Sequence, residues 1–420
     1  MRPNIRRTVP MALCNFPLAG VLLPLFFFSA AGTASEGKTL PEGVFRLRIP
    51  FRSAVASHGF SSEGKKADSG LRLNVASGAL VFEYGYSSAV SFQLIVPAVL
   101  RNQMSMDGSV FQKSFVFQEK YDEFIAAAAA KLVSDGLCSD VNACVDAIQK
   151  KGFALPATTE LTLPTGEKLT VRAGVPLKEV ASSLVTRAAL PAEGRTGIGD
   201  IEIGTLIAIA DPNVGLWKKD WPLNLSVGLG LRAPTGSFSD VSAAQRGTGR
   251  GTWDLGFRTN VDWYAASGFV MSFQNQWEQM IVGGVKRRSS LLDSSKLNSA
   301  DPLIEGADQV ANEAKFERSG ARQIGFLKVA SGLGDFVSSL DPVVLSLQWK
   351  YDLDPKTLRG GRIESTDSQL HSVLAGVQLD GLKLNVPAQL EVEYEFPVAG
   401  RNRRIAPQIM TASMKAYYRF

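Results

Sequence analysis

The sequence predicts an all-β protein: a transmembrane antiparallel up-and-down β-barrel of about 12 strands, with a partly helical insertion after the third strand. Three observations predict it: an N-terminal export signal, a series of segments in which apolar and polar residues alternate, and a last strand that ends on an aromatic residue, Phe420. Alternation at period two indicates a strand with one apolar and one polar face. In a membrane barrel the apolar face meets lipid and the polar face lines the lumen.

The composition excludes several other classes of protein. The chain has 420 residues, of which 45% are hydrophobic and 20% charged, and its mean hydropathy is +0.03. A disordered chain would carry fewer large apolar residues, and three cysteines do not make a disulfide-rich scaffold. The net charge of +5 falls to +2 without residues 1–34, because that segment holds three basic residues and no acidic one. With no basic block left, we expect no nucleic acid among the partners.

Residues 1–34 have the form of a secretory signal peptide. They contain, in order, three basic residues, a short apolar run and a small-residue cleavage pattern: Arg2, Arg6 and Arg7, residues 18–28, and Gly32 to Ala34. The apolar run is too short and too broken by proline for a membrane-spanning helix. Twin-arginine export is an alternative. We expect residues 35–43 to form a periplasmic N-terminal segment and residues 44–420 to form the barrel, in the bacterial outer membrane.

Alternating segments recur along the rest of the chain. In 223–231, for example, Leu and Val occupy the odd positions and Asn, Ser and Gly the even ones. The predicted strands cover 44–53, 70–86, 90–100, 198–210, 222–233, 253–264, 268–281, 321–332, 341–352, 368–379, 388–396 and 408–420. Many run to about ten or twelve residues, the length that crosses a bilayer at a tilt, whereas strands of a soluble sandwich usually have about five or six. Residues 70–86 change phase near Ser77, which indicates a bulge or a break.

The connections between these strands support the membrane barrel over the sandwich. Long and short connections alternate, as external loops and periplasmic turns do in outer-membrane barrels. The last strand carries aromatic residues at Tyr418 and Phe420, which resembles the recognition signal of bacterial outer-membrane barrels. We therefore expect the lipid bilayer and, through the Phe420 strand, the barrel-assembly machinery among the partners.

The insertion at 101–197 is far longer than an ordinary loop. Its pattern predicts three helices and one hairpin: helices at 119–133, 140–151 and 177–190, and a hairpin over 160–171. The insertion either caps the external mouth or folds into the lumen as a plug. Cys138 and Cys144 lie close together in an exported chain, so we predict a disulfide between them. The alternative is two free cysteines on a helix.

Charged residues on the polar faces of the strands must point inward, because an Arg at mid-depth in lipid costs about 2–4 kcal/mol. The side chains that we expect to line the lumen are Arg46, Arg48, Arg52, Arg232, Arg258, Glu278, Lys350, Glu391, Glu393 and Glu395. The first three form a basic ladder and the last three an acidic one. Either the two ladders pair across a narrow lumen and brace its wall, or they form a polar constriction in a permeation path.

The sequence offers little for catalysis or metal binding. His58 and His371 have no cluster of acidic residues or cysteines at ligand spacing, so we expect no metal and no cofactor. No Gly-x-Ser-x-Gly elbow is present. His371 and Ser372 leave an outer-membrane lipase or esterase as an alternative, but we expect no enzyme.

Four short motifs occur in a familiar order. They are Ala79–Pro97 with its Tyr-Gly and Pro, Gly197–Gly204 with Gly-x-Gly-Asp, Gly228–Gly236 ending in Pro-Thr-Gly, and Gly247–Gly256 with Gly-x-Gly. Their order resembles the outer-membrane family described as MetA-pathway of phenol degradation. That resemblance implies a transporter of hydrophobic or aromatic compounds, although the large insertion departs from the family's compact pattern.

These observations predict a passive outer-membrane channel for small hydrophobic or aromatic molecules. Its lumen would be narrowed by the charged ladders and gated by the insertion. One alternative is a structural or adhesive barrel with a closed lumen, whose insertion binds an external partner. The lipase or esterase is a second alternative.

Overall fold

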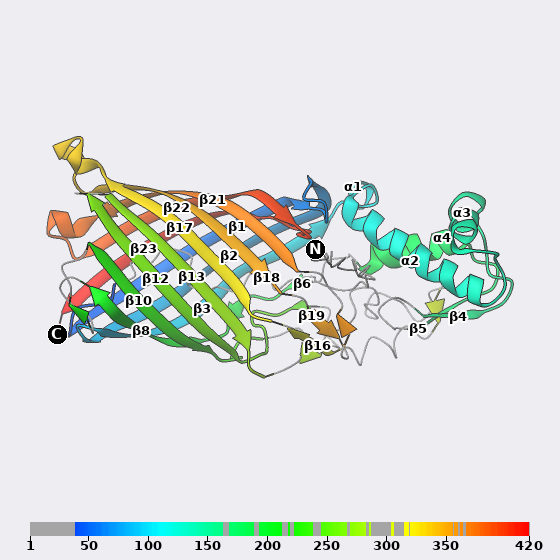
Figure 1. Cartoon of the computed structure of the whole chain (residues 1–420), viewed down its shortest axis with the longest axis horizontal. Helices are drawn as coiled ribbons and strands as arrows, with labels where there is room; N and C mark the ends of the chain where they lie inside the picture. The colour runs from blue at the N-terminus through cyan, green and yellow to red at the C-terminus, as the bar shows by residue number, and fades with distance from the viewer. Residues whose placement is uncertain are drawn as a thin grey trace, which may run out of the picture.

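The computed structural model shows a long, tilted-strand barrel with a group of helices beyond one end (Figure 1). It describes residues 38–419, except 163–167, 189–192, 212–216, 219–221, 238–244, 267–268, 283–284, 287–303, 306–314, 319, 356, 360–361 and 364–366. The predicted signal peptide and Phe420 lie outside the described residues.

Twelve long strands form the wall. They are β1 (Val44–Phe60), β2 (Lys66–Ser87), β3 (Val90–Met106), β8 (Glu202–Asp211), β10 (Leu223–Arg232), β12 (Asp254–Ala266), β13 (Phe269–Met280), β17 (Arg322–Gly332), β18 (Val343–Asp354), β21 (Ser368–Asp380), β22 (Ala388–Arg401) and β23 (Gln408–Arg419). Each pairs antiparallel with the next in chain order. The first strand, β1, also pairs with the last, β23, and this closes the barrel. The predicted architecture is confirmed.

Shorter strands occur beside the wall and in the connections between its strands. In the barrel sheet, β7 (Gly197–Ile198) pairs with β3, and β9 (Trp217–Lys218) runs parallel to β8. The other short strands are β4 (Thr159–Thr162), β5 (Lys168–Val171), β6 (Glu193–Gly194), β11 (Gln245–Arg246), β14 (Val285–Lys286), β15 (Ile304–Glu305), β16 (Lys315–Arg318), β19 (Thr357–Arg359) and β20 (Arg362–Ile363). They form three small sheets of their own. Three 3-10 turns also occur: η1 (Leu333–Asp335), η2 (Ser338–Leu340) and η3 (Gly381–Leu384).

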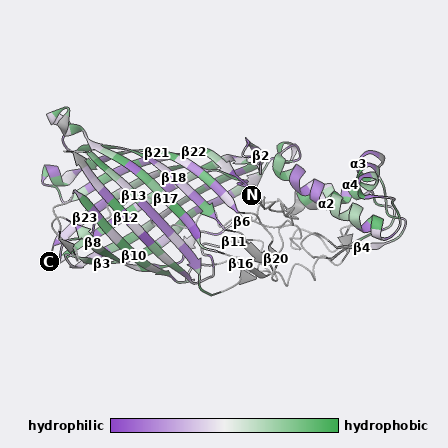
Figure 2. Cartoon of the chain, viewed as in Figure 1, coloured by the Kyte–Doolittle hydropathy of each residue, from purple (hydrophilic) through white to green (hydrophobic). Residues whose placement is uncertain are grey.

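The two faces of each long strand differ as the alternation predicts, and hydrophilic and hydrophobic residues alternate along the barrel (Figure 2). On β22, for example, Val392 is 51% exposed on the outer surface, while its neighbour Glu391 is 4% exposed. Since outward side chains are apolar and exposed, they form the surface that a bilayer covers. The polar side chains between them point into the lumen.

The first three strands are longer than their patterns predict, with 17, 22 and 17 residues. Their additional residues have weaker alternation, because a strand that continues past the lipid needs no apolar outer face. The phase change near Ser77 proves to be a bulge and not a break. On β2, Ala76 pairs with Arg101 and Ser77 with Val99, so β3 carries the additional residue, Leu100.

In the described part of the insertion after β3 there are four helices: α1 (Gly108–Phe111), α2 (Phe115–Ser134), α3 (Val141–Lys151) and α4 (Leu177–Ala188). The helices and the hairpin lie close to their predicted positions. Side chains cap three of the helix N-termini: Asp107 for α1, Ser114 for α2 and Asp140 for α3. Among the described residues, no helix combines the length and apolar character that crossing a bilayer requires.

The insertion has a core of its own and one apolar contact with the barrel. Its core packs α2, α3 and α4 around buried residues such as Ile125, Leu132 and Ile148. Cys138 and Cys144 are disulfide-bonded beside this core, with their Cα atoms 5.7 Å apart. The helices extend away from the end of the barrel (Figure 1).

The contact between insertion and barrel lies at the external rim. Residues at the start of the insertion and inward-facing residues of β1, β2 and β23 bury one another: Phe111, Val116 and Phe117 with Ala54, Leu71, Leu73, Val75 and Ile409. Val185 of α4 and Ile405 of the β22–β23 loop complete this cluster. One side of the barrel mouth is therefore filled by apolar side chains.

Candidate functional site

A belt of alternating charges lines the lumen near its external end. Arg232 of β10 lies within ion-pair distance of three carboxylates: Glu202 at 2.7 Å, Asp254 at 3.2 Å and Glu278 at 3.2 Å. Strand register brings these residues together, because Arg232 stands directly opposite Glu202 on one neighbour and Asp254 on the other. The belt is thus a consequence of cross-strand pairing on one face of the sheet.

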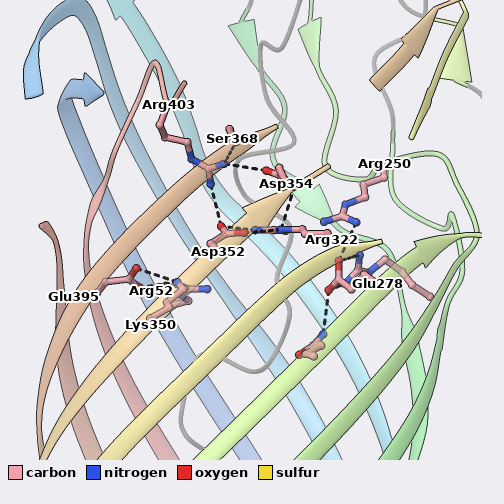
Figure 3. A network of polar contacts seen from close by, with 12 residues as sticks. Arg52, Arg250, Glu278, Arg322, Lys350, Asp352, Asp354, Ser368, Glu395 and Arg403 are labelled. Atoms are coloured by element: carbon pink, nitrogen blue, oxygen red, sulfur yellow. Dashed lines mark hydrogen bonds and ion pairs between the residues drawn. The ribbon is translucent and has the colours of Figure 1, made fainter. Parts of the chain in front are cut away.

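The belt continues along the next strands (Figure 3). Glu278 of β13 stands opposite Arg322 of β17 in the register. Arg322 then contacts two carboxylates of β18, with 2.8 Å from Nη2 to Asp352 Oδ2 and 3.4 Å from Nε to Asp354 Oδ1. These side chains are largely buried, and Arg232 and Arg322 each have carboxylates within ion-pair distance, as buried charges require.

Two arginines from loops join the belt. Arg250, just before β12, contacts Asp254 at 2.9 Å and Glu278 at 3.1 Å. Arg403, in the loop between β22 and β23, donates to Asp352 at 3.0 Å, to Asp354 at 2.9 Å and to the Ser368 hydroxyl at 2.9 Å (Figure 3). These contacts bind the external loops to the wall, so that loop and barrel form one polar network.

A second group of charges surrounds the acidic ladder of β22. Glu391 lies 3.4 Å from Lys415 and 3.6 Å from Lys328, and Lys328 is 3.9 Å from Glu393. Glu395 binds Lys350 at 2.9 Å and Arg52 at 3.9 Å. The acidic ladder is therefore compensated mainly by lysines of other strands.

The basic ladder does not face the acidic ladder across the lumen. Barrel closure places β1 and β22 on either side of β23, so the two ladders lie on the same part of the wall. Arg46 instead binds Glu83 of β2, at 2.5 Å and 3.1 Å, and Gln93 donates to the same carboxylate at 3.2 Å. Of the two alternatives for the ladders, pairing across the lumen does not occur. The contact of Arg52 with Glu395, at 3.9 Å, runs along the wall past β23.

The structure places all ten predicted residues on the inward face. Cross-strand register and burial put Arg46, Arg48, Arg52, Arg232, Arg258, Glu278, Lys350, Glu391, Glu393 and Glu395 on the lumen side of their strands. Arg232 and Glu278 belong to the belt, Arg52, Lys350, Glu391, Glu393 and Glu395 to the group around the acidic ladder, and Arg46 pairs with Glu83. That these side chains line a substrate path is a proposal taken up below.

Several members of these groups were absent from the prediction. They are Glu83, Glu202, Arg250, Asp254, Arg322, Lys328, Asp352, Asp354, Arg403 and Lys415. The alternation of β12 and β18 assigns Asp254 and Asp352 to the polar face, so the sequence pattern is sufficient to predict that both face the lumen. No periodicity marks Arg250 or Arg403, because both belong to loops that turn back onto the wall.

The lumen also has an apolar side. Ala79, Val81 and Ile95 form a buried cluster on the inward faces of β2 and β3. Ile324 and Phe326 form another on β17. Apolar side chains on the lumen face of a barrel provide contact for molecules that water solvates poorly.

His371 and Ser372 do not form the histidine–serine pair of a lipase or esterase. His371 and Ser372 are consecutive in β21, so their side chains point to opposite faces of the sheet. His371 lies on the outer face against Trp349, with ring centroids 5.5 Å apart. Ser372 is buried on the inner face. The imidazole and the hydroxyl therefore do not meet.

The fold and its faces define the class: the chain is a β-barrel protein of the bacterial outer membrane. Residues 152–278 match the family described as MetA-pathway of phenol degradation. The family resemblance seen in the sequence is confirmed over this segment. A search of curated proteins finds no match to the chain.

Solved structures share the barrel at low sequence identity. An outer membrane channel from Pseudomonas putida F1 is 10% identical, with a TM-score of 0.54, over 91% of this chain and 98% of that chain. The beta domain of the Bordetella autotransporter BrkA is 8% identical, with a TM-score of 0.38, over 90% and 100%. A TodX mutant, described as a monoaromatic hydrocarbon channel, is 8% identical, with a TM-score of 0.35, over 94% and 95%. The first of these supports the fold.

Proposed function

We propose that this barrel is a passive channel for small apolar or aromatic molecules across the outer membrane. The observation that carries the proposal is a pocket in the lumen wall, bounded by β3, β8, β10, β12 and β13. Its lining comes from five adjacent strands of the wall and it is open towards the lumen.

The walls of the pocket suit a molecule with apolar surface. Ile95 belongs to both the pocket lining and the apolar cluster of β2 and β3, so the pocket continues into the apolar side of the lumen. The family match and the outer-membrane channel of similar fold agree with this function. In this proposal the charged groups narrow and brace the passage, and the ten predicted residues line it.

The insertion supplies the gate in this proposal. Phe111, Phe117 and the other apolar residues at the external rim cover one side of the mouth. A solute therefore enters beside them, past the belt that includes Arg403 and Asp352. We also propose that residues 1–34 are a signal peptide for export and that residues 35–43 lie in the periplasm. The barrel-assembly machinery would recognise the last strand.

One observation favours the second candidate, a structural or adhesive barrel with a closed lumen. The side chains of the lumen are largely buried, as with Arg46 at 5% and Arg48 at 2% exposure, so little of the lumen is open to water. In that case the insertion, with its own disulfide-linked core, would serve as the surface that binds an external partner.

Measuring the flux of ions and small molecules through the reconstituted protein distinguishes the two candidates. We would reconstitute the full chain and a variant lacking residues 101–197 in planar bilayers and in asymmetric vesicles with lipopolysaccharide in the outer leaflet. A channel gives conductance steps and faster uptake of benzyl alcohol than vesicles without protein, with larger steps in the deletion variant. Absence of both conductance and uptake in both proteins would refute the channel and favour the closed barrel.

A further inference from the structure

The floor of the lumen pocket is bare backbone. Gly204, Gly230 and Gly256 stand directly opposite one another on the adjacent strands β8, β10 and β12. All three are on the inward face, and Gly228 lies two residues from Gly230 on that same face. Three neighbouring strands thus lack a side chain at one level of the wall. The exposed peptide planes form a flat surface on which a planar ring can lie.

The rim of this floor carries polar groups. The polar side chains that line the pocket are Gln93, Glu202, Arg232, Asp254, Arg258, Gln276 and Glu278, and Ile95 lies on its apolar side. The carboxylate of Glu278 is bound by Arg232 and Arg250, and the amide of Gln276 donates to it at 3.1 Å. On the external side of the pocket, Glu202, Asp254 and Glu278 are therefore each in contact with an arginine other than Arg258.

Arg258 differs from the other basic residues of the rim. Its side chain reaches the pocket from β12, two residues from Gly256 along the strand. Within the described ranges, no carboxylate lies within 4.0 Å of its guanidinium and no side chain hydrogen-bonds to it. By contrast, Arg232 on the neighbouring strand contacts three carboxylates.

The carboxylates near Arg258 have other partners. Glu83 accepts hydrogen bonds from Arg46 and Gln93, and Glu202 accepts from Arg232 at 2.8 Å. Arg46 and Arg48 add two more positive charges in the surroundings of Arg258. Arg258 is therefore a positive charge in reach of the floor whose neighbouring carboxylates are each bound by another residue, which favours an anionic ligand at its guanidinium.

We propose that the pocket binds a small aromatic carboxylate, with the ring on the glycine floor and the carboxylate on Arg258. A guanidinium holds a carboxylate by two parallel hydrogen bonds, and this fixes the orientation of the ring. Ile95 contacts the ring edge from the apolar side. This inference rests on the proposed channel function and narrows its substrate class from aromatic molecules to aromatic acids.

The test compares three solutes in planar bilayers that contain the full chain: benzoate, acetate and benzyl alcohol. Benzoate combines ring and charge, acetate has the charge alone and benzyl alcohol the ring alone. Reversal potentials in sodium benzoate and sodium acetate gradients give relative anion permeabilities, and uptake into vesicles follows benzyl alcohol. We expect benzoate to permeate at least tenfold better than acetate.

The variant Arg258→Gln should lower benzoate permeability about tenfold or more while benzyl alcohol uptake changes less than twofold. Arg401→Gln is the matched control, because it removes the same charge at the exposed end of β22 and should leave all three solutes unchanged. If Arg258→Gln and Arg401→Gln give the same benzoate permeability, the assignment of Arg258 is wrong.

A second variant tests the floor. The added Cβ in Gly230→Val meets its nearest atom at 3.5 Å, an ordinary contact, and the valine methyl groups then project over the glycine floor. We expect benzoate permeability to fall while acetate permeability is unchanged. Equal loss of both anions would overturn the ring site. Benzyl alcohol uptake without any benzoate preference would overturn this inference and leave the channel standing, whereas no flux of any solute would refute the channel itself.

Discussion

Arg322 and Asp352 form a two-point contact on neighbouring strands of the wall, with 3.0 Å from Nε to Oδ1 and 2.8 Å from Nη2 to Oδ2. Both side chains are buried, and the same carboxylate also accepts from Arg403. Asp352 is therefore the point at which the charge belt of the wall meets the last external loop. A complete buried ion pair contributes little to the free energy of unfolding. Removing one partner lowers that free energy strongly, because the other charge stays buried without compensation.

Replacing Arg322 by leucine should therefore destabilise the barrel strongly. Arg403 alone would then face both Asp352 and Asp354, and we expect a loss of about 3–5 kcal/mol in the free energy of unfolding. The double variant Arg322→Leu/Asp352→Leu keeps the 2.9 Å pair of Arg403 and Asp354 and should recover most of that loss. Urea unfolding in lipid vesicles measures all three proteins. A double variant no more stable than Arg322→Leu would show that charge imbalance is not the cause.

A second prediction concerns the junction between insertion and barrel. Gly70 has a φ of +71°, and a Cβ added there would lie 2.4 Å from the backbone nitrogen of Phe111. Gly70→Ala should therefore displace α1 from β2 and loosen the apolar cluster at the mouth. We expect faster proteolysis within 107–188 and larger conductance, with the heat-induced gel shift of the barrel unchanged. Gly136→Ala is the control, because it has a similar φ of +72° and no atom within 4 Å of the added Cβ.

A third prediction uses pH. Asp140 caps α3 by accepting from the Ala143 amide at 2.9 Å, and this hydrogen bond lowers the pKa of its carboxyl. Because the folded-state pKa is below the unfolded one, the cap stabilises α3 above the ordinary Asp value of about 3.9 and is lost as the pH falls through the folded value.

Asp140→Asn provides the matched comparison, since asparagine caps equally well and does not titrate. We expect both proteins to show the same protection of α3 amides at pH 7. As the pH falls from 5 towards 2.5, protection in the natural sequence should decline relative to Asp140→Asn. Hydrogen exchange with mass spectrometry reports this ratio, and a ratio constant with pH would contradict the role of the cap.

Alternation along each strand is a local property, and it suffices to assign faces. The alternation of their sequence neighbours alone predicts that Arg232 and Glu278 lie on the polar side, and the structure puts them there. Barrel closure and strand count followed from the same patterns together with the loop lengths. The bulge near Ser77 was detectable because it interrupts the alternation, although its additional residue belongs to β3.

The partner of each charge was not predictable in this way. Arg46 and Glu83 are 37 residues apart, and Arg403 and Asp352 are 51 apart, so their contacts depend on register and on loops that return to the wall. The row of Gly204, Gly230 and Gly256 likewise exists only once three strands are aligned. Sequence patterns assign a residue to a face, whereas the sites on that face arise from the pairing of strands.

The last prediction tests the lipid-facing surface. Leu347 is 60% exposed on the outer face of β18, near the middle of that strand, and Leu353 lies on the same face at its external end. If lipid covers this band, Leu347→Lys should cost about 2–4 kcal/mol and Leu353→Lys about 0–1 kcal/mol, because the penalty for a charge falls towards the interface. The two variants add the same charge to the same strand, so unfolding in vesicles isolates the effect of depth. Equal costs would mean that lipid does not cover β18 at Leu347, and the outer face would then need another partner.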